Sequence, residues 1–162
     1  MGKIIMQTTQ EGKRRASPLS PELAAAIRPA MEAATRLRLR GGRFEIYNVV
    51  EAVYSVYMDW KHRKIAKRSA RALAGQLDIA QRKDMTSIRI LIEAVLPEAN
   101  HKQKSRWVRA LEYVYSENVS PAEFRKFVRT RGSIAGCARF AVQVKRKRRR
   151  PRRDCVEGDW DD

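Results

Sequence analysis

The sequence predicts an all-α protein, organised as a single compact domain of about six helices. Apolar residues recur at helical spacing through most of the chain, and residues that begin or end helices stand at the borders of these segments. No alternating strand pattern extends beyond a few residues. We expect a flexible basic arm over residues 1–16, the helical domain over 17–144, and a basic and then acidic tail over 145–162. Residues 17–83 and 84–144 are candidate sub-modules of this domain.

Two helices are expected before residue 61. Ser20 can cap the first, over residues 21–39, and Gly41-Gly42 ends it. The second, over residues 44–60, carries two adjacent apolar stripes, which indicates a wide buried face and a central place in the core. Its tyrosines could stack on bases, but their interleaving with valine and isoleucine favours packing. The same helix could also face a partner subunit in a homo-oligomer.

At Lys61 the apolar stripes end and a segment rich in lysine and arginine begins. Residues 61–71 contain six cations and no acid, so we expect the helix to continue, or to resume after a kink, as an exposed basic rod. Residues 71–79 match the apolar spacing of the first helix and turn of a helix-turn-helix reader, although Asp78 replaces the turn glycine. The second half of this motif would need a three-residue insertion at residues 83–85 to keep its register.

Capping signals divide the remainder of the domain. Thr86 or Ser87 precedes a short helix that is apolar on nearly all sides and should be buried. Asn100 and Gln103 form a capping box at the start of the next helix.

The last two helices are expected on either side of Gly132. Ser120, Pro121 and Glu123 predict a second capping box, for a helix over residues 121–131. Ser133 can cap the last helix, whose small first turns favour close helix packing over base reading.

Charge is the strongest compositional signal. The chain has 35 Lys/Arg against 18 Asp/Glu and a net charge of +17. The tail does not create this excess, because residues 1–144 alone hold 27 Lys/Arg against 13 Asp/Glu. A body this basic attracts polyanions, of which nucleic acid is the commonest. An acidic protein or an anionic membrane surface is the alternative polyanion. Because the chain has no long apolar run, we expect a soluble protein, and we name no membrane among its partners.

The candidate nucleic-acid-binding residues lie in the basic segment after the second helix, in two later helices and in the tail. Cations at the start of the helix that follows Asn100 oppose its macrodipole, which suggests another use for their charge. The residues are Lys61, Arg63, Lys64, Lys67, Arg68, Arg71, Lys102, Lys104, Arg106, Arg125, Lys126, Arg129, Arg131, Lys145, Arg146, Lys147, Arg148, Arg149, Arg150, Arg152 and Arg153.

No constellation for catalysis is found in the sequence. His62 and His101 stand in basic contexts, and Cys137 lies inside an apolar helical pattern. Cys137 and Cys155 are too few for a disulfide framework or a four-ligand zinc site. We expect no enzyme activity, no cofactor and no metal. Without a secretory signal, we expect an intracellular protein, in the cytoplasm or nucleoid of a bacterium or in the nucleus of a eukaryote.

The leading hypothesis is a DNA-binding protein, regulatory in transcription or architectural, that grips phosphates with cations from several helices. RNA is the nearest alternative, although no RNA-recognition aromatic motif and no GXXG loop is present. A different alternative is a helical adaptor that docks acidic proteins through a basic patch with exposed apolar anchors, such as Trp60 or Trp160. The acidic residues 154–162 could pair with the basic run in cis and compete with phosphate.

Overall fold

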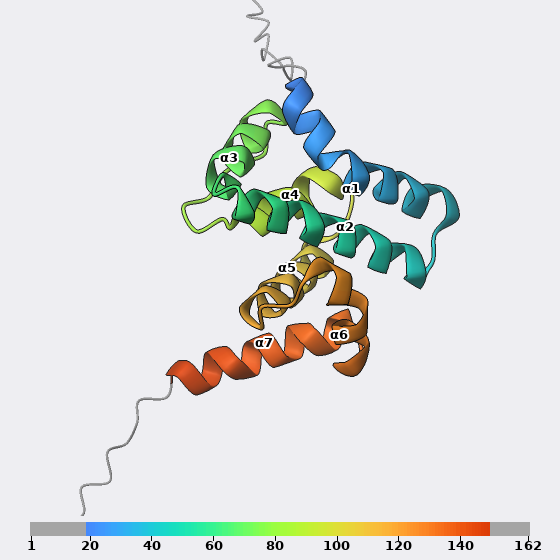
Figure 1. The fold of residues 1–162 in the computed structure, drawn as a ribbon, viewed down its shortest axis with the longest axis vertical. Coiled ribbons are helices and arrows are strands. Elements are labelled where there is room, and N and C mark those ends of the chain that lie inside the picture. Colours follow the sequence, from blue (N-terminus) through green and yellow to red (C-terminus); the bar gives the residue numbers. More distant parts are fainter. Residues whose placement is uncertain (1–18, 150–162) are drawn as a thin grey trace, which may run out of the picture.

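The computed structural model describes the backbone of residues 19–149 and the side chains of residues 19–145. In this part of the chain, seven α-helices and one 3₁₀ turn form a single helical domain without strands, which confirms the expected fold class (Figure 1). The basic arm over residues 1–16 and residues 150–162 lie outside the described part. The elements are α1 (Pro21–Arg40), α2 (Arg43–His62), α3 (Ala66–Gln76), α4 (Ser87–Val95), α5 (His101–Ser116), η1 (Pro121–Glu123), α6 (Phe124–Thr130) and α7 (Ile134–Arg149).

Helices α1 and α2 form an antiparallel hairpin (Figure 1). The Ser20 hydroxyl accepts a hydrogen bond from the backbone N–H of Leu23 at 3.4 Å, so the predicted cap is confirmed. At the tip, Gly41 and Gly42 adopt φ values of 64° and 96°. Two consecutive left-handed residues require glycine, because a Cβ makes this conformation costly. The glycine pair therefore sets where the hairpin turns.

Helix α2 is the centre of the core, as predicted. Its buried residues contact α1, α3, α4, α5 and α6 from the same chain. Trp60 is only 1% exposed, so it cannot serve as the exposed anchor of a docking patch. From Val49 onward the apolar stripes of α2 are likewise covered by the chain itself, whereas Phe44 at the start of the helix is exposed. The covered residues are Val49, Val50, Val53, Tyr54, Val56, Tyr57 and Trp60.

The basic segment after α2 is not one continuous rod. Helix α2 ends at His62, and Lys64 adopts a left-handed φ of 59°. The N–H of Ile65 bonds back to the carbonyl of Trp60 at 2.9 Å, and α3 begins at Ala66. Of the two expected alternatives, resumption after a break is therefore correct. The break turns α3 back over α4.

The helix-turn-helix interpretation of the segment that begins with residues 71–79 is wrong. Asp78 does adopt the left-handed φ, 52°, that a turn glycine would take. However, ten residues separate the end of α3 from the start of α4, where the motif has a turn of three or four. Helix α4 is also buried on most sides, with Ile88, Leu91 and Ile92 at most 2% exposed. It cannot enter a groove of DNA.

The two later capping boxes have opposite outcomes. At the start of α5, Asn100 Oδ1 accepts from the Gln103 N–H at 2.8 Å and Gln103 Oε1 accepts from the Asn100 N–H at 3.3 Å, as predicted. The predicted box at Ser120 does not form. The Ser120 hydroxyl donates instead to the Glu123 carboxylate at 2.8 Å, and residues 121–123 adopt a 3₁₀ turn. The predicted helix 121–131 is thus divided into η1 and a shorter α6.

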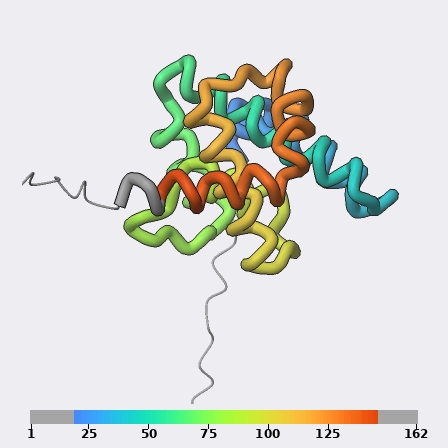
Figure 2. The backbone as a smooth tube through the Cα atoms, turned by 90° about the horizontal axis from the view of Figure 1, so that it is seen from below, coloured from blue at the N-terminus to red at the C-terminus, as the bar shows by residue number. Residues whose placement is uncertain are grey.

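Helix α7 extends further than expected. Ser133 caps it, since its hydroxyl accepts from the Gly136 N–H at 3.0 Å. The helix then continues to Arg149, into the basic run that was expected to belong to the tail after the helical domain. Helix α7 lies across the lower face of the molecule in Figure 1, and Figure 2 shows it in front when that face is viewed directly. The start of the basic run is therefore carried on a helix.

We expect Tyr54→Phe to lower the free energy of unfolding by about 1–3 kcal/mol. Tyr54 is fully buried, and its hydroxyl donates to the carbonyl of Val119 at 2.6 Å. Removing the hydroxyl leaves that carbonyl without its partner. Urea denaturation would measure the change, with Tyr47→Phe at a partly exposed position of the same helix as the control, expected within about 0.5 kcal/mol of wild type. Equal stabilities of the two variants would contradict this role.

Candidate nucleic-acid interface

A basic cleft lies between the end of α2, helix α3 and the connector that leads into α4. Its volume is about 720 Å³. Five cations line it, and the only acid in its lining is Asp84. The apolar part of the lining comes from Tyr57, Ala66, Ala70, Met85 and Ile90. The cations of this basic cleft are Lys61, Lys67, Arg71, Arg82 and Lys83.

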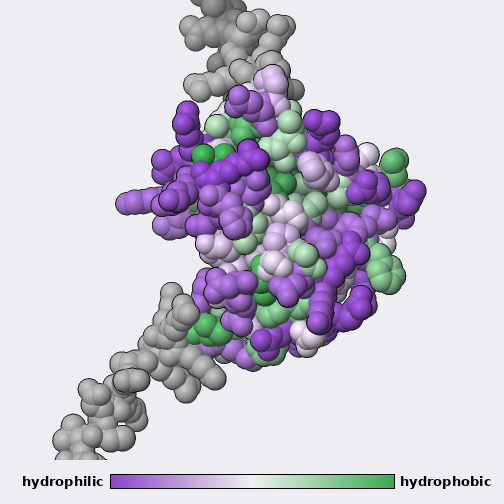
Figure 3. All heavy atoms as spheres, viewed as in Figure 1, coloured by the Kyte–Doolittle hydropathy of each residue, from purple (hydrophilic) through white to green (hydrophobic). Residues whose placement is uncertain are grey.

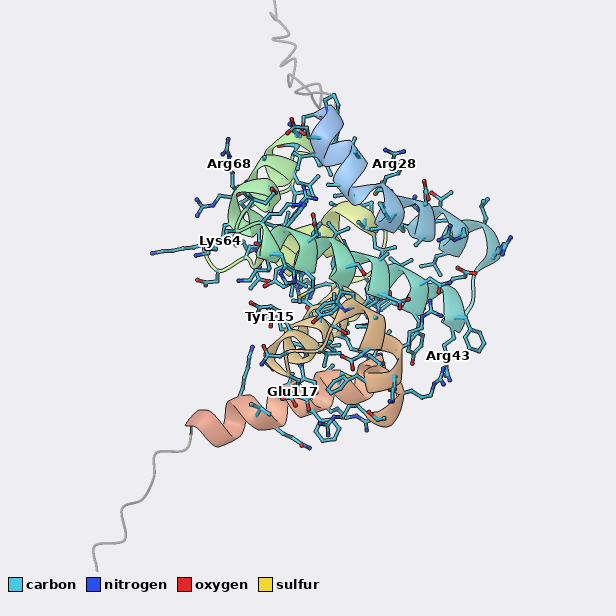
Figure 4. All side chains as sticks on the ribbon, viewed as in Figure 1. Arg28, Arg43, Lys64, Arg68, Tyr115 and Glu117 are labelled. Carbon is cyan, nitrogen blue, oxygen red and sulfur yellow. The ribbon has the colours of Figure 1, made fainter. Side chains whose placement is uncertain are left out.

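The break after α2 produces the cleft. It places Ala66 and Ala70, both buried, on the side of α3 that faces the core. Lys67 and Arg71 follow one residue later and therefore share one face of the helix, one turn apart. Lys64 and Arg68 project outward on the left of the molecule (Figure 4), where strongly hydrophilic side chains cover α3 and the end of α2 (Figure 3). The cleft is thus the concave part of a wider basic surface.

The cations of the basic cleft are not neutralised by the carboxylates that the structure describes. Among residues 19–145, no carboxylate lies within 4.0 Å of Lys67, Arg71, Arg82 or Lys83. Lys61 Nζ lies 5.3 Å from the centroid of the Tyr115 ring, a cation–π contact. Arg63, just outside the cleft, is paired with Asp59 at 3.0 Å. Arg82 and Lys83 were not among the predicted contacts, because the sequence does not reveal that their connector folds back over α3.

Several other predicted contacts are engaged within the protein. Arg125 pairs with Glu51 at 2.6 Å, Arg131 with Glu117 at 3.8 Å, and Lys145 with Glu112 at 3.7 Å. The guanidinium of Arg131 also lies 5.0–5.8 Å from the centroids of three aromatic rings. These side chains are exposed or half-buried, and such surface pairs are weak, so a phosphate could compete for them. Lys102, Arg106, Lys126 and Arg129 are exposed. The side chains of residues 146–149 and the whole of residues 150–153 lie outside the described part of the chain.

Lys104 was wrongly predicted as a nucleic-acid contact. It is 6% exposed, and its Nζ bonds the Glu93 carboxylate at 2.5 Å and the Pro97 carbonyl at 2.9 Å. Arg89 pairs with the same carboxylate at 2.9 Å. Burial by itself would raise the pKa of Glu93, but the hydrogen bonds and charges of Lys104 and Arg89 outweigh burial and lower it. Lys104 therefore helps to join α4 to α5 and does not face solvent.

A second groove runs along the seam between α5 and α7, with a volume of about 510 Å³. Three of its lining residues, Arg109, Arg139 and Gln143, were not among the predicted contacts. Only the packing of α7 on α5 brings them together, although their helical spacing was visible in the sequence. The lining is Arg106, Arg109, Ala135, Ala138, Arg139, Val142 and Gln143.

Cys137 has the environment of a core residue. It is fully buried on the inner side of α7. Burial raises the pKa of its thiol to about 11, despite the opposing charge of Arg131. At neutral pH this thiol is protonated and therefore a poor nucleophile.

No protein-family model matches the sequence, and no curated protein or solved structure is significantly similar to it. Within the described residues, no group of three or more His, Cys, Asp or Glu side chains is placed to hold a metal ion. None of the helices described is both long enough and apolar enough to cross a membrane. The site is therefore assigned from the chemistry of its own residues.

We expect Lys104→Met to lower the free energy of unfolding at pH 7 by about 1–3 kcal/mol, because it leaves part of the Glu93 carboxylate unpaired. Glu93 has a lowered pKa, so its contribution is present at neutral pH and is lost as the pH falls below the ordinary value of 4.5. The difference from wild type should thus narrow at pH 3. Urea denaturation at both pH values would measure it.

Lys102→Met provides the control for this variant, since Lys102 is exposed on the same turn of α5. It should leave stability nearly unchanged. A Lys104→Met protein that is as stable as wild type, but binds polyanions more weakly, would contradict the structural role.

Proposed function

We propose that the protein binds nucleic acid, DNA in preference to RNA, through phosphate contacts from the basic cleft and the exposed cations around it. One observation carries this proposal. Five cations converge on a single opening, and none of the five has a carboxylate within ion-pair distance among the described side chains. A regulatory or an architectural role fits such binding.

Electrostatics supports a polyanionic partner. Cations that surround one concave opening repel one another, and low-dielectric walls strengthen their common field. A phosphate chain relieves this repulsion and releases its own condensed counterions, which favours association. A cleft of 720 Å³ falls in the size range of pockets that take drug-sized ligands. It therefore has room for a segment of the sugar–phosphate backbone.

We expect the affinity for duplex DNA to fall steeply with salt, by roughly 10³–10⁵-fold between about 50 and 200 mM if about 6–10 phosphates are contacted. The double variant Lys67→Ala/Arg71→Ala should reduce the slope of log K against log salt by about 0.9 for each phosphate that is no longer neutralised. Fluorescence anisotropy over a salt series on duplex DNA, single-stranded DNA and RNA would measure both quantities.

The double variant Arg36→Ala/Arg40→Ala is a matched control. It removes two exposed cations, four residues apart on α1 and distant in the fold from the basic cleft. This pair should change the slope less than the cleft pair does. A DNA affinity that does not change with salt, or an equal change in the salt slope for the two double variants, would count against the proposal.

A second candidate function is a helical adaptor for an acidic protein partner, and the tip of the α1–α2 hairpin favours it. Leu39 and Phe44 are 80% and 85% exposed there, the largest exposures of any large apolar side chain described. Arg40 and Arg43 flank the two glycines between them. Exposed apolar anchors beside cations are typical of interaction hot spots. The sequence had suggested Trp60 or Trp160 as the apolar anchors, not Leu39 and Phe44.

We expect Phe44→Ser to separate the two candidates. A serine at this exposed position should leave the free energy of unfolding within about 0.5 kcal/mol of wild type. If the hairpin tip docks a protein, the variant loses that complex and keeps its affinity for DNA. Pull-down with wild-type and variant protein after nuclease treatment would test this. A partner that is retained equally by both proteins would exclude the hairpin tip as the docking site.

A further inference from the structure

The basic cleft leaves unexplained a second group of cations, those on the seam between α5 and α7. Arg106 and Arg109 project from α5, and Arg139 and Gln143 from α7, around one shallow groove of about 510 Å³. Ala135 and Ala138 form part of its floor. In Figures 1 and 2, α7 is the outermost helix on this side of the molecule, so its free face is open to a large partner.

Helices α6 and α7 are joined in the manner of a helix-turn-helix. The turn has three residues, 131–133, and Gly132 takes a left-handed φ of 83°. Ser133 then caps α7. A three- or four-residue turn that contains glycine is the usual connection in this motif, whose second helix enters the major groove of DNA. The short turn of a helix-turn-helix, which the sequence suggested after residues 71–79, is therefore found between α6 and α7.

The pattern of burial along α7 shows which face of the helix is open to a partner. Ile134, Cys137 and Ala141 pack inward, at most 8% exposed. Arg139 and Gln143 are exposed on the opposite side and lie four residues apart, so they occupy the same face on successive turns. The small side chain of Ala135 stands one turn before Arg139, and it would allow the backbone of α7 to approach a groove closely. The exposed face of α7 thus carries a small side chain in its first turn and polar side chains in the turns that follow.

The first turns of this helix were expected to favour packing over base reading, but Arg139 and Gln143, which follow them, are exposed and have the chemistry of base readers. Arginine makes paired hydrogen bonds to O6 and N7 of guanine, and glutamine makes paired bonds to N6 and N7 of adenine. Among residues 19–145, no carboxylate lies within 4.0 Å of Arg139 or Arg106. Arg109 uses its Nε–H on the carbonyl of Ser105 at 3.1 Å, which leaves its terminal N–H groups for a phosphate.

We propose that α7 is a recognition helix that lies in the major groove of duplex DNA, with Arg139 and Gln143 at base edges and Arg106 and Arg109 on the flanking phosphates. This inference rests on the proposed function and deepens it, because it names duplex DNA as the ligand and makes binding depend on base sequence. The phosphate contacts position the helix, and the two α7 side chains supply the discrimination. The basic cleft contributes a second phosphate contact that does not depend on sequence.

Selection from a pool of random duplexes tests this inference directly. The full-length wild-type protein should enrich a common motif that contains guanine and adenine at defined positions. Arg139→Ala and Gln143→Ala should each lower the affinity for the enriched duplex by about 5- to 150-fold, the range that corresponds to one bidentate pair of hydrogen bonds to a base. They should change the affinity for unrelated DNA far less.

Two further variants separate base reading from charge. Arg139→Lys keeps the charge but loses the planar fork, so it should lose the sequence preference and retain the salt dependence. Arg129→Ala removes an exposed cation of α6 that does not line the groove. It should affect enriched and unrelated DNA by the same factor. Both substitutions are at exposed positions, and circular dichroism would verify that each variant is folded.

The outcomes distinguish the two proposals. A wild-type protein that binds DNA but enriches no motif, or an Arg139→Ala protein that keeps the preference, overturns the recognition helix and leaves phosphate binding intact. Binding to RNA alone also overturns the recognition helix. A protein that binds neither DNA nor RNA at low salt overturns both proposals.

Discussion

Tyr54 ties the central helix α2 to the segment that leads from α5 into η1. Its hydroxyl donates to the Val119 carbonyl at 2.6 Å, and its ring packs on Phe124 at a centroid distance of 5.5 Å. Tyr54 lies in the middle of α2, whose other buried residues contact α1, α3 and α4. Because α2 is fixed in this way, its two ends define the two prominent surface features of the first half: the hairpin tip at its start and the basic cleft at its end.

The few acids of the chain determine which cations remain available. Within the described side chains, six carboxylates take part in seven ion pairs. Five of these pairs join different segments of the chain, and two are between residues four apart. The acids are thus used mainly to link helices. Helix α3, the connector after it and the outer face of α7 receive none of them. Among the described side chains, unpaired cations therefore line the basic cleft and the groove between α5 and α7, and further ones lie on α1 and at the start of α2, at Arg28, Arg36, Arg40 and Arg43.

Local interactions explain which elements could be predicted. The cap at Asn100 depends on two side chains within one turn, and the end of α1 depends on the glycine pair. Both features are determined by a few neighbouring residues. The box at Ser120 failed for an equally local reason, since its hydroxyl has a competing partner in the Glu123 carboxylate. The prediction of Lys104 as a nucleic-acid contact was wrong for a different reason. Its neighbours in sequence are exposed cations, and only the packing of α5 on α4 brings Glu93 to its ammonium group.

The sequence by itself determined the all-α class, most helix limits and the basic excess, because these follow from helical periodicity, caps and composition. The tertiary structure decided which cations stay unpaired and which of them gather. The pairing of Arg125 with Glu51 spans 74 residues, and the basic cleft joins Lys61 to Lys83 across an intervening helix. Such groupings depend on how helices cross and which side of each is buried. No local pattern contains that information. The expected nucleic-acid-binding residues therefore included a buried lysine, and only the tertiary structure adds Arg82, Lys83 and Arg139 to the candidates.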